Sequence, residues 1–158
     1  MGIDLNCTLD EAKQWLRKRL TKGARCPLCH QYAKLYKRKL NTGLAKFLLD
    51  LYKIGRHEEY HHIASLLHFK TKTSGTDFYI LKFWELIEEK SKDINADTKT
   101  SGYWKITCKG IAFVEQRLKV PSHVCLYNGR LFGFEGEKVT IGQCLGERFS
   151  YSELMGGF

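Results

Sequence analysis

The chain of 158 residues carries 26 lysines and arginines against 17 acids, a formal net charge of +9, and 43% of its residues are hydrophobic. This apolar content suffices for a packed core and excludes wholesale disorder, and no run of about eighteen apolar residues exists to form a membrane-spanning helix. The charge is concentrated, because twelve basic residues between Lys13 and Lys53 face a single acid, Asp50. Such a segment attracts a polyanion, so a nucleic acid is favoured over an ordinary solvated surface.

Residues 1–40 are expected to form a basic helix followed by a Cys-Pro-x-Cys loop. Thr8 and Glu11 fit a capping box, and apolar residues then recur at helical spacing until Gly23. The opposite helix face and the basic run behind the loop supply the residues expected to neutralise phosphates: Arg17, Lys18, Arg19, Lys34, Lys37, Arg38 and Lys39.

Six cysteines without a secretion signal indicate reduced thiols or metal ligands, and a cytoplasmic location is expected. Cys26 and Cys29 are spaced to form half of a tetrahedral zinc site. His123 and Cys125, two apart on an expected strand, are the neatest partners, and the other candidates are Cys7, His30, His57, His61, His62 and Cys144. Two alternatives stay open: free thiols that pack as small apolar residues, and a redox dithiol.

Residues 41–121 are expected to form the central domain. A helix capped by Asn41 or Thr42 comes first, and a second helix is predicted over Glu58–His68. A third helix, capped at Ser74, is predicted to run through Trp84.

The pattern changes after this third helix. Leu86–Lys90 suits either a strand or the tail of the helix, and residues 91–102 form a polar loop. Tyr103–Thr107 is a predicted strand because it is rich in aromatic and β-branched residues. Thr107 is then expected to cap a helix that stops near Val120.

Two segments carry a resemblance to a known family. Leu81-Lys82-Phe83-Trp84-Glu85-Leu86-Ile87-Glu88-Glu89 and Gly102-Tyr103-Trp104-Lys105-Ile106-Thr107-Cys108-Lys109-Gly110 resemble the wing region of bacterial and phage winged-helix proteins. In that family an aromatic-Gly-Leu-Ile-Glu segment leaves the recognition helix, and Thr-x-x-Gly follows the second wing strand. This chain has Glu85 where glycine is usual. The resemblance covers about residues 41–118, and the whole arrangement also resembles uncharacterised phage proteins.

The resemblance implies an α+β fold: a winged-helix core preceded by the N-terminal helix and Cys-Pro-x-Cys loop and followed by a β-hairpin. It also implies that the helix opening at Ser74 enters the major groove of double-stranded DNA. The residues then expected to contact DNA are Lys70, Lys72, Thr76, Tyr79, Lys82, Lys92 and Lys99. Ordinary surface positions are the alternative, and Asp77 and Glu85 on the same element would repel phosphate.

Residues 122–158 are expected to form the β-hairpin appendage. Asn128-Gly129 separates Val124–Tyr127 from Arg130–Phe134 and favours a type I′ turn. Lys138–Ile141 is predicted to add a third strand.

These features together predict a non-enzymatic DNA-binding protein of a phage or bacterium, for example a transcription regulator. No phosphate-binding glycine loop, nucleophile elbow or convergent pair of acids indicates an enzyme. The alternative is a small phage factor that docks on a host enzyme through its aromatic hairpin and inhibits it. RNA is a third candidate partner.

Overall fold

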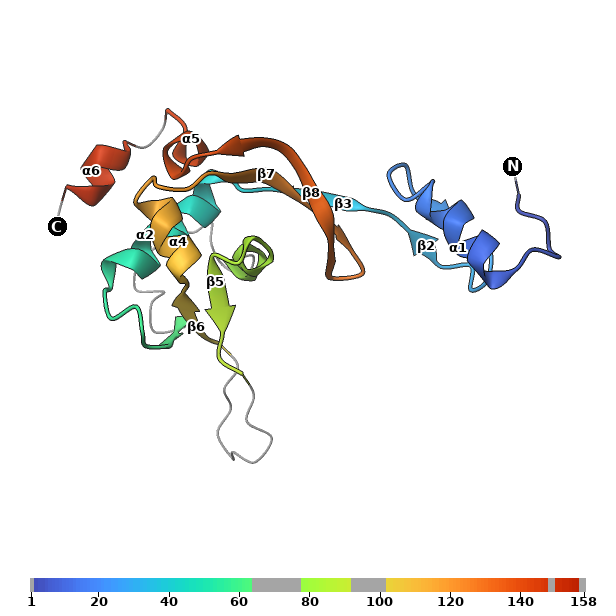
Figure 1. The fold of residues 1–158 in the computed structure, drawn as a ribbon, viewed down its shortest axis with the longest axis horizontal. Helices are drawn as coiled ribbons and strands as arrows, with labels where there is room; N and C mark the ends of the chain where they lie inside the picture. The colour runs from blue at the N-terminus through green and yellow to red at the C-terminus, as the bar shows by residue number, and fades with distance from the viewer. Residues whose placement is uncertain (1, 64–77, 92–101, 148–149, 157–158) are drawn as a thin grey trace. The chain divides into compact units, whose positions relative to one another are not determined.

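The computed structural model describes residues 2–63, 78–91, 102–147 and 150–156 (Figure 1). It shows a mixed α+β chain in which short helices alternate with antiparallel sheets. The predicted α+β class is therefore correct.

The chain divides into two compact units, each built from two separate stretches of sequence. We call residues 1–38 and 123–135 the basic unit, because of the charge described below. We call residues 39–122 and 136–158 the core unit, because it holds most of the buried apolar side chains.

The basic unit begins with α1 (Leu9–Arg17), whose start is fixed by the predicted capping box. Thr8 Oγ1 accepts a hydrogen bond from the backbone N–H of Glu11 at 3.3 Å, and the Glu11 carboxylate accepts one from the N–H of Thr8 at 2.7 Å. Two short strands follow, β1 (Ala24–Arg25) and β2 (Tyr32–Ala33), which pair antiparallel. The Cys-Pro-x-Cys loop is therefore the tip of a hairpin.

A three-stranded sheet has the order β3-β7-β8, formed by β3 (Tyr36–Lys39), β7 (Val120–Tyr127) and β8 (Arg130–Val139). The predicted hairpin is confirmed, because Asn128 and Gly129 have φ of 51° and 71°, the positive angles of a type I′ turn. The strand β3 places part of the basic run against β7, a pairing that the sequence pattern does not indicate.

The predicted third strand over Lys138–Ile141 is wrong. β8 continues to Val139, and Thr140 then caps the helix α5 (Ile141–Leu145). The prediction failed at Gly136, because a glycine between two glutamates is typical of a turn that separates two strands. Its φ of 82° is accommodated within the strand, where glycine often marks a bulge.

A second three-stranded sheet lies in the core unit and has the order β4-β6-β5. β5 (Ile87–Glu89) and β6 (Tyr103–Ile106) pair antiparallel, with Ile87 opposite Ile106. These strands confirm the prediction for Tyr103–Thr107, and they show that the segment after Trp84 is a strand.

The first strand of this sheet is β4 (His61–His62), which pairs antiparallel with β6 so that His61 lies opposite Trp104. The prediction of a helix from Glu58 is therefore wrong at these positions, because pairing with β6 outweighs a local helical pattern. Residues 64–68 of that predicted helix lie outside the described residues.

The helix predicted from Ser74 to Trp84 is described only over Phe78–Trp84, where it is a 3₁₀ helix, η1. The predicted helix is therefore present over this part, in the 3₁₀ and not the α form. A 3₁₀ turn aligns residues three apart, which brings Leu81 and Trp84 onto the same buried face. The residue after η1 is Glu85, whose φ of 61° is the left-handed conformation that favours glycine.

Thr107 caps α4 (Cys108–Val114), as predicted, although the helix ends well before Val120. The Thr107 hydroxyl accepts from the backbone N–H of Gly110 at 3.0 Å and donates to the carbonyl of Glu85 at 2.6 Å. A Cβ on Gly110 would lie 2.1 Å from the carbonyl oxygen of Leu86, so only glycine fits there.

The helix α2 (Thr42–Lys53) lies at the centre of the core unit, where it packs against α4, α5, β6 and η1. Asn41 caps it, because its Oδ1 accepts from the N–H of Leu44 at 3.0 Å. Its buried stripe consists of Leu44, Ala45, Phe47, Leu48, Leu49 and Leu51. The last element, α6 (Tyr151–Met155), packs against α5.

Candidate nucleic-acid interface

The positive charge predicted to meet phosphate lies mainly in the basic unit. This unit contains ten lysines and arginines and four acids. It holds six of the seven residues predicted to neutralise phosphates, namely Arg17, Lys18, Arg19, Lys34, Lys37 and Arg38. Lys39, the seventh, is the first residue of the core unit. An excess of this size attracts a polyanion over several ångströms.

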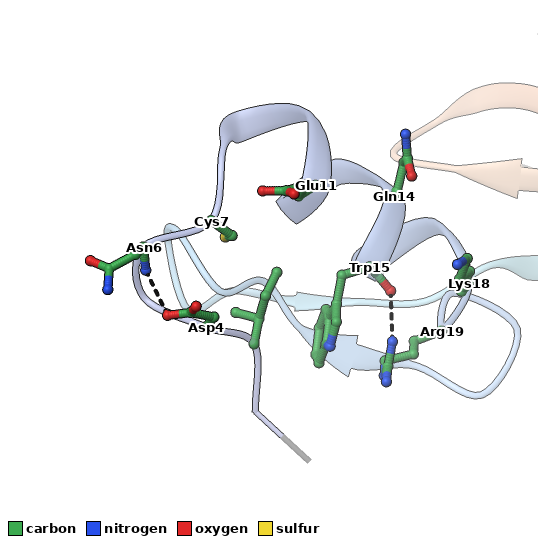
Figure 2. Close-up of a pocket in the computed structure, with 9 residues that line it drawn as sticks. Asp4, Asn6, Cys7, Glu11, Gln14, Trp15, Lys18 and Arg19 are labelled. Atoms are coloured by element: carbon green, nitrogen blue, oxygen red, sulfur yellow. Dashed lines mark hydrogen bonds between the residues drawn. The ribbon is translucent and has the colours of Figure 1, made fainter.

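The guanidinium of Arg19 packs against the side chain of Trp15 on α1. Its guanidinium lies 4.1 Å from the centroid of the Trp15 ring, and Nη1 donates to the Trp15 carbonyl at 3.2 Å. Both residues line an open pocket of about 630 Å³ together with Lys18 and Glu11 (Figure 2). The sequence does not reveal this pocket, although the four-residue spacing of Trp15 and Arg19, which lies just after α1, is a usable signal.

Lys37 is paired with an acid from the later part of the chain. Its Nζ forms an ion pair with the carboxylate of Glu135 on β8. The hydrogen bond and the charge of Glu135 raise the pKa of Lys37, and Lys37 in turn lowers the pKa of Glu135. Because Glu135 offsets this charge, we expect Lys37 to contribute less to phosphate binding than the exposed Arg17, Lys18 and Lys34.

Cys26 and Cys29 lie together at the tip of the β1–β2 hairpin. The N–H of Cys26 donates to the carbonyl of Gln31 at 2.8 Å, and the N–H of His30 donates to the carbonyl of Cys26 at 2.9 Å. The backbone N–H groups of Cys29 and Leu28 hydrogen-bond to the sulfur of Cys26 and lower its pKa. The thiol of Cys26 is therefore more easily deprotonated than an ordinary cysteine.

His30, one of the predicted partners, lies in the same loop, whereas the two neatest partners lie on another strand. His123 and Cys125 are both on β7, and Cys125 is buried, with its pKa raised by burial and by Glu135. Burial also raises the pKa of Cys144 to about 11. Among the residues that the structure describes, no three His, Cys, Asp or Glu side chains gather closely enough to hold a metal ion.

The residues predicted to enter a DNA groove are only partly described. Lys70, Lys72, Thr76, Lys92 and Lys99 lie outside the described residues. Tyr79 and Lys82 are both exposed on η1, with Lys82 Nζ 5.7 Å from the centroid of the Tyr79 ring.

Acids lie close to η1. An open pocket of about 580 Å³ is lined by Lys82 and also by Glu85, Glu88 and Glu89. Lys109 Nζ lies 3.6 Å from the Glu85 carboxylate and partly offsets that charge. The described surface of η1 is therefore less favourable to phosphate than that of the basic unit.

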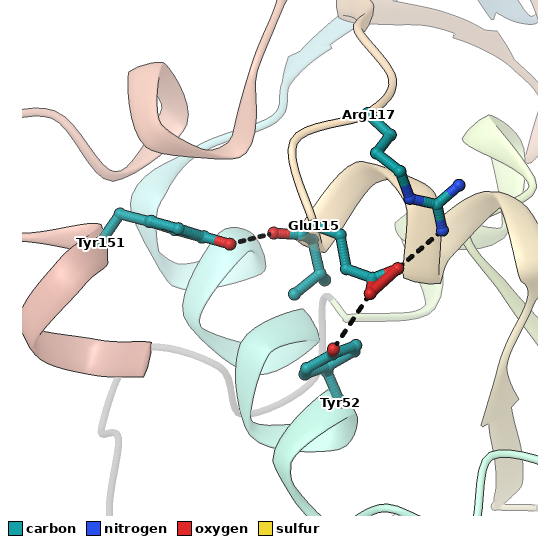
Figure 3. A network of polar contacts seen from close by, with 5 residues as sticks. Tyr52, Glu115, Arg117 and Tyr151 are labelled. Atoms are coloured by element: carbon teal, nitrogen blue, oxygen red, sulfur yellow. Dashed lines mark hydrogen bonds and ion pairs between the residues drawn. The ribbon is translucent and has the colours of Figure 1, made fainter. Parts of the chain in front are cut away.

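A polar network that the sequence analysis did not identify joins three helices of the core unit (Figure 3). Glu115 accepts from the Tyr52 hydroxyl at 3.4 Å and from Arg117 Nη2 at 2.6 Å, and Arg117 lowers its pKa. The hydroxyl of Tyr151 donates to the carbonyl of Val114 at 2.7 Å. The Tyr151 bond holds α6 against the end of α4, and the Tyr52 bond links that end to α2, so we assign these contacts a structural role.

Comparison of the chain with protein families, curated proteins and solved structures found no match. Among the described residues, every helix is too short or too polar to cross a membrane.

Proposed function

We propose that this chain is a non-enzymatic nucleic-acid-binding protein that takes double-stranded DNA as its partner. The observation that carries the proposal is the basic unit, with ten lysines and arginines against four acids. Arg17, Lys18 and Lys34 are exposed there and supply charges that phosphates can approach. Binding arises mainly from phosphate neutralisation and the release of counterions.

We further propose that the core unit is a winged helix. Two features support this assignment. Among the described elements, helix α2, strand β4, helix η1 and strands β5 and β6 occur in the order of that fold, and β6 lies between β4 and β5. Glu85 also adopts the glycine-like conformation at the position where the family has glycine. In this arrangement Tyr79 and Lys82 contact the DNA, with Lys70, Lys72, Thr76, Lys92 and Lys99 as further candidates.

Salt dependence tests the proposal directly. If about six phosphates are neutralised, the affinity for a labelled random duplex falls roughly 10³-fold between about 50 and 200 mM salt. Fluorescence anisotropy at several salt concentrations measures this fall. Binding that does not respond to salt would refute phosphate neutralisation as its source. Competition by single-stranded DNA and by RNA, at one salt concentration, identifies the preferred nucleic acid.

Substitutions locate the interface. Lys18→Gln and Lys34→Gln remove exposed charges from the basic unit, and each is expected to reduce the slope of log affinity against log salt by about one. Lys119→Gln is the matched control, because Lys119 is an exposed lysine of the core unit. Equal effects of all three substitutions would show that the basic unit is not the interface.

A second candidate function has its own support. The exposed side chains of Leu131, Phe132 and Phe134 lie on β8, and Phe132 also lines an apolar pocket of about 300 Å³ with Leu16 and Leu20. A protein partner, such as a host enzyme that the chain inhibits, would bury such a surface. The substitution Phe132→Ser separates the two candidates, because it leaves duplex binding intact if DNA is the partner and abolishes capture of a protein partner.

A further inference from the structure

The thiols of Cys26 and Cys29 lie in one short, closed loop. The β1–β2 pairing closes the hairpin, and within it the N–H of Cys26 donates to the carbonyl of Gln31 at 2.8 Å and the N–H of His30 donates to the carbonyl of Cys26 at 2.9 Å. His30 completes the turn with a φ of 62°, which lets the chain double back directly after Cys29. Two thiolates on one tight loop supply half of a tetrahedral zinc site, which needs four ligands.

The described residues of one chain do not supply the other half. They contain no group of three or more His, Cys, Asp or Glu side chains that could hold a metal ion. Within the basic unit, Cys125 is buried in the sheet beside Glu135 and Lys37. Cys7 lines the pocket of Figure 2, to which neither Cys26 nor Cys29 contributes.

Apolar side chains surround this half-site and are left exposed. Leu28, Tyr32 and Tyr36 are 59%, 58% and 59% exposed. Tyr32 and Tyr36 also line an open pocket of about 260 Å³ together with Cys26 and Cys29. Exposed apolar side chains gathered around a pair of thiols are typical of a surface that a partner covers.

The side chains around the two thiols are positive, and this charge favours a negatively charged zinc–thiolate group between two copies. Lys34 lines the pocket, Arg25 Nη1 donates to the carbonyl of His30 at 3.2 Å, and the lining contains no acid. A zinc ion with four thiolates carries a net charge of −2, which positive side chains on both sides of the site would offset. Without that charge, two copies of this surface would repel each other.

We propose that Cys26 and Cys29 of two copies of this chain bind one Zn²⁺ between them and so form a dimer. Each copy presents the same pair of ligands, as an isologous two-fold interface requires. Binding converts four thiols to thiolates and releases their protons to solvent. The exposed Leu28, Tyr32 and Tyr36 of each copy then become buried around the metal.

The composition of the basic unit agrees with such a link. Of the buried apolar residues among the described residues, the basic unit holds only five: Ala12, Leu20, Ala33, Val124 and Cys125. Small units with so little core are commonly stabilised by a metal ion or by oligomerisation. One zinc ion shared between two copies would provide both.

The experiment measures zinc content and molar mass of the full chain, purified under reducing conditions with Zn²⁺. We expect one zinc ion per two chains and a dimer by light scattering, which a strong chelator converts to a monomer. Substitution of Co²⁺ for the zinc is expected to give the absorption bands of tetrahedral cobalt with four thiolates. Cys26→Ser and Cys29→Ser are expected to abolish both metal binding and dimerisation. Cys108→Ser is the matched control, because it removes an exposed thiol of α4 and leaves both properties unchanged.

Three outcomes would overturn the proposal. One zinc ion per monomeric chain would place all four ligands in a single copy. A dimer that survives both the chelator and the serine substitutions would be held by another surface. A reduced chain that binds neither Zn²⁺ nor Co²⁺ would leave the thiols without a metal role. The chelator and cobalt measurements use the unsubstituted chain, so they decide the question even if a serine variant fails to fold.

Discussion

The two units of the chain differ in how much of their apolar surface they bury. Among the described residues, the core unit holds 20 of the 25 buried apolar side chains, and the basic unit holds five. The exposed large apolar side chains show the opposite distribution, because eight of nine belong to the basic unit and only Tyr79 belongs to the core unit. We infer that the core unit is stabilised by its own packing, whereas the basic unit depends more on local motifs and on what it binds.

The substitution with the largest expected effect on stability is Gly110→Ala, which tests the packing of the core unit. The new Cβ would lie 2.1 Å from the Leu86 carbonyl oxygen and 2.7 Å from Ile106 Cγ1, so α4 must move away from β5 and β6. We expect a loss of about 3 kcal/mol in the free energy of unfolding. Chemical denaturation followed by the fluorescence of Trp84 and Trp104, in a Trp15→Phe background, reports this loss for the core unit alone.

Gly142→Ala is the matched control for that substitution. Gly142 lies in α5, and its nearest neighbour for a new Cβ is the Gln116 side chain at 3.4 Å, an ordinary contact. We expect no loss of stability, because alanine is the better helix former. Equal losses for the two alanine variants would show that the backbone contact at Gly110 is not what destabilises the core unit.

The second test uses the same motif in both units. Thr8 with Glu11 caps α1 of the basic unit, and Thr140 with Gln143 caps α5 of the core unit. Each threonine-to-alanine substitution removes one cap and is expected to cost about 1 kcal/mol locally. Hydrogen exchange should show Thr8→Ala opening α1 alone, while Thr140→Ala lowers the stability of the whole core unit. Identical exchange patterns in the two variants would contradict the difference between the units.

Particular residues explain how much of this structure is readable from the sequence. The capping residues Thr8, Asn41 and Thr107 and the Asn128-Gly129 turn act within a few residues, so their positions were predicted correctly. The pairing of His61-His62 with β6 and of β3 with β7 depends on partners distant in the sequence, so neither was predicted.

The candidate site shows the same limit. The charge of the basic segment and the pair of thiols are visible in the sequence. The pairing of Lys37 with Glu135 is not, because it depends on two strands that are distant in the sequence. The Arg19 contact with Trp15 is local, so only its geometry had to come from the structure. The exposure of Leu28, Tyr32 and Tyr36 around the thiols also requires coordinates.

A third test concerns the backbone of the core unit. Glu85 has a φ of 61°, a conformation that costs a side-chain-bearing residue about 1–2 kcal/mol. Glu85→Gly should raise the free energy of unfolding by about 0.5–1 kcal/mol, since glycine's greater freedom in the unfolded chain offsets part of the gain. Glu85→Gln is the control, because it removes the charge that faces Lys109 and keeps the strained backbone. If the Gln variant gained as much stability as the Gly variant, the gain would come from charge and not from φ.

The smallest expected effect is electrostatic and lies on the surface of the β4-β6-β5 sheet. The Glu88 carboxylate lies 3.1 Å from Lys105 Nζ and accepts from the Tyr60 hydroxyl at 3.0 Å, and these partners lower its pKa. A lowered pKa in the folded state means that the ionised form adds stability above the unfolded pKa, and that this stability is lost as pH falls through the folded pKa. Glu88→Gln should therefore cost under about 1 kcal/mol at neutral pH, because both side chains of the pair are partly exposed to solvent.

That cost should shrink as the pH falls below about 4, where the carboxylate of the original chain is protonated as well. Urea denaturation of both proteins across this range, at low salt, measures the difference. Glu89→Gln at the neighbouring exposed position controls for the general effect of removing an acid. If the stability difference for Glu88→Gln stayed constant with pH, the lost interaction would be the Tyr60 hydrogen bond and not the charge of Glu88. The Glu88–Lys105 ion pair would then contribute no measurable stability to the core unit. That result would support the conclusion that apolar packing stabilises this unit.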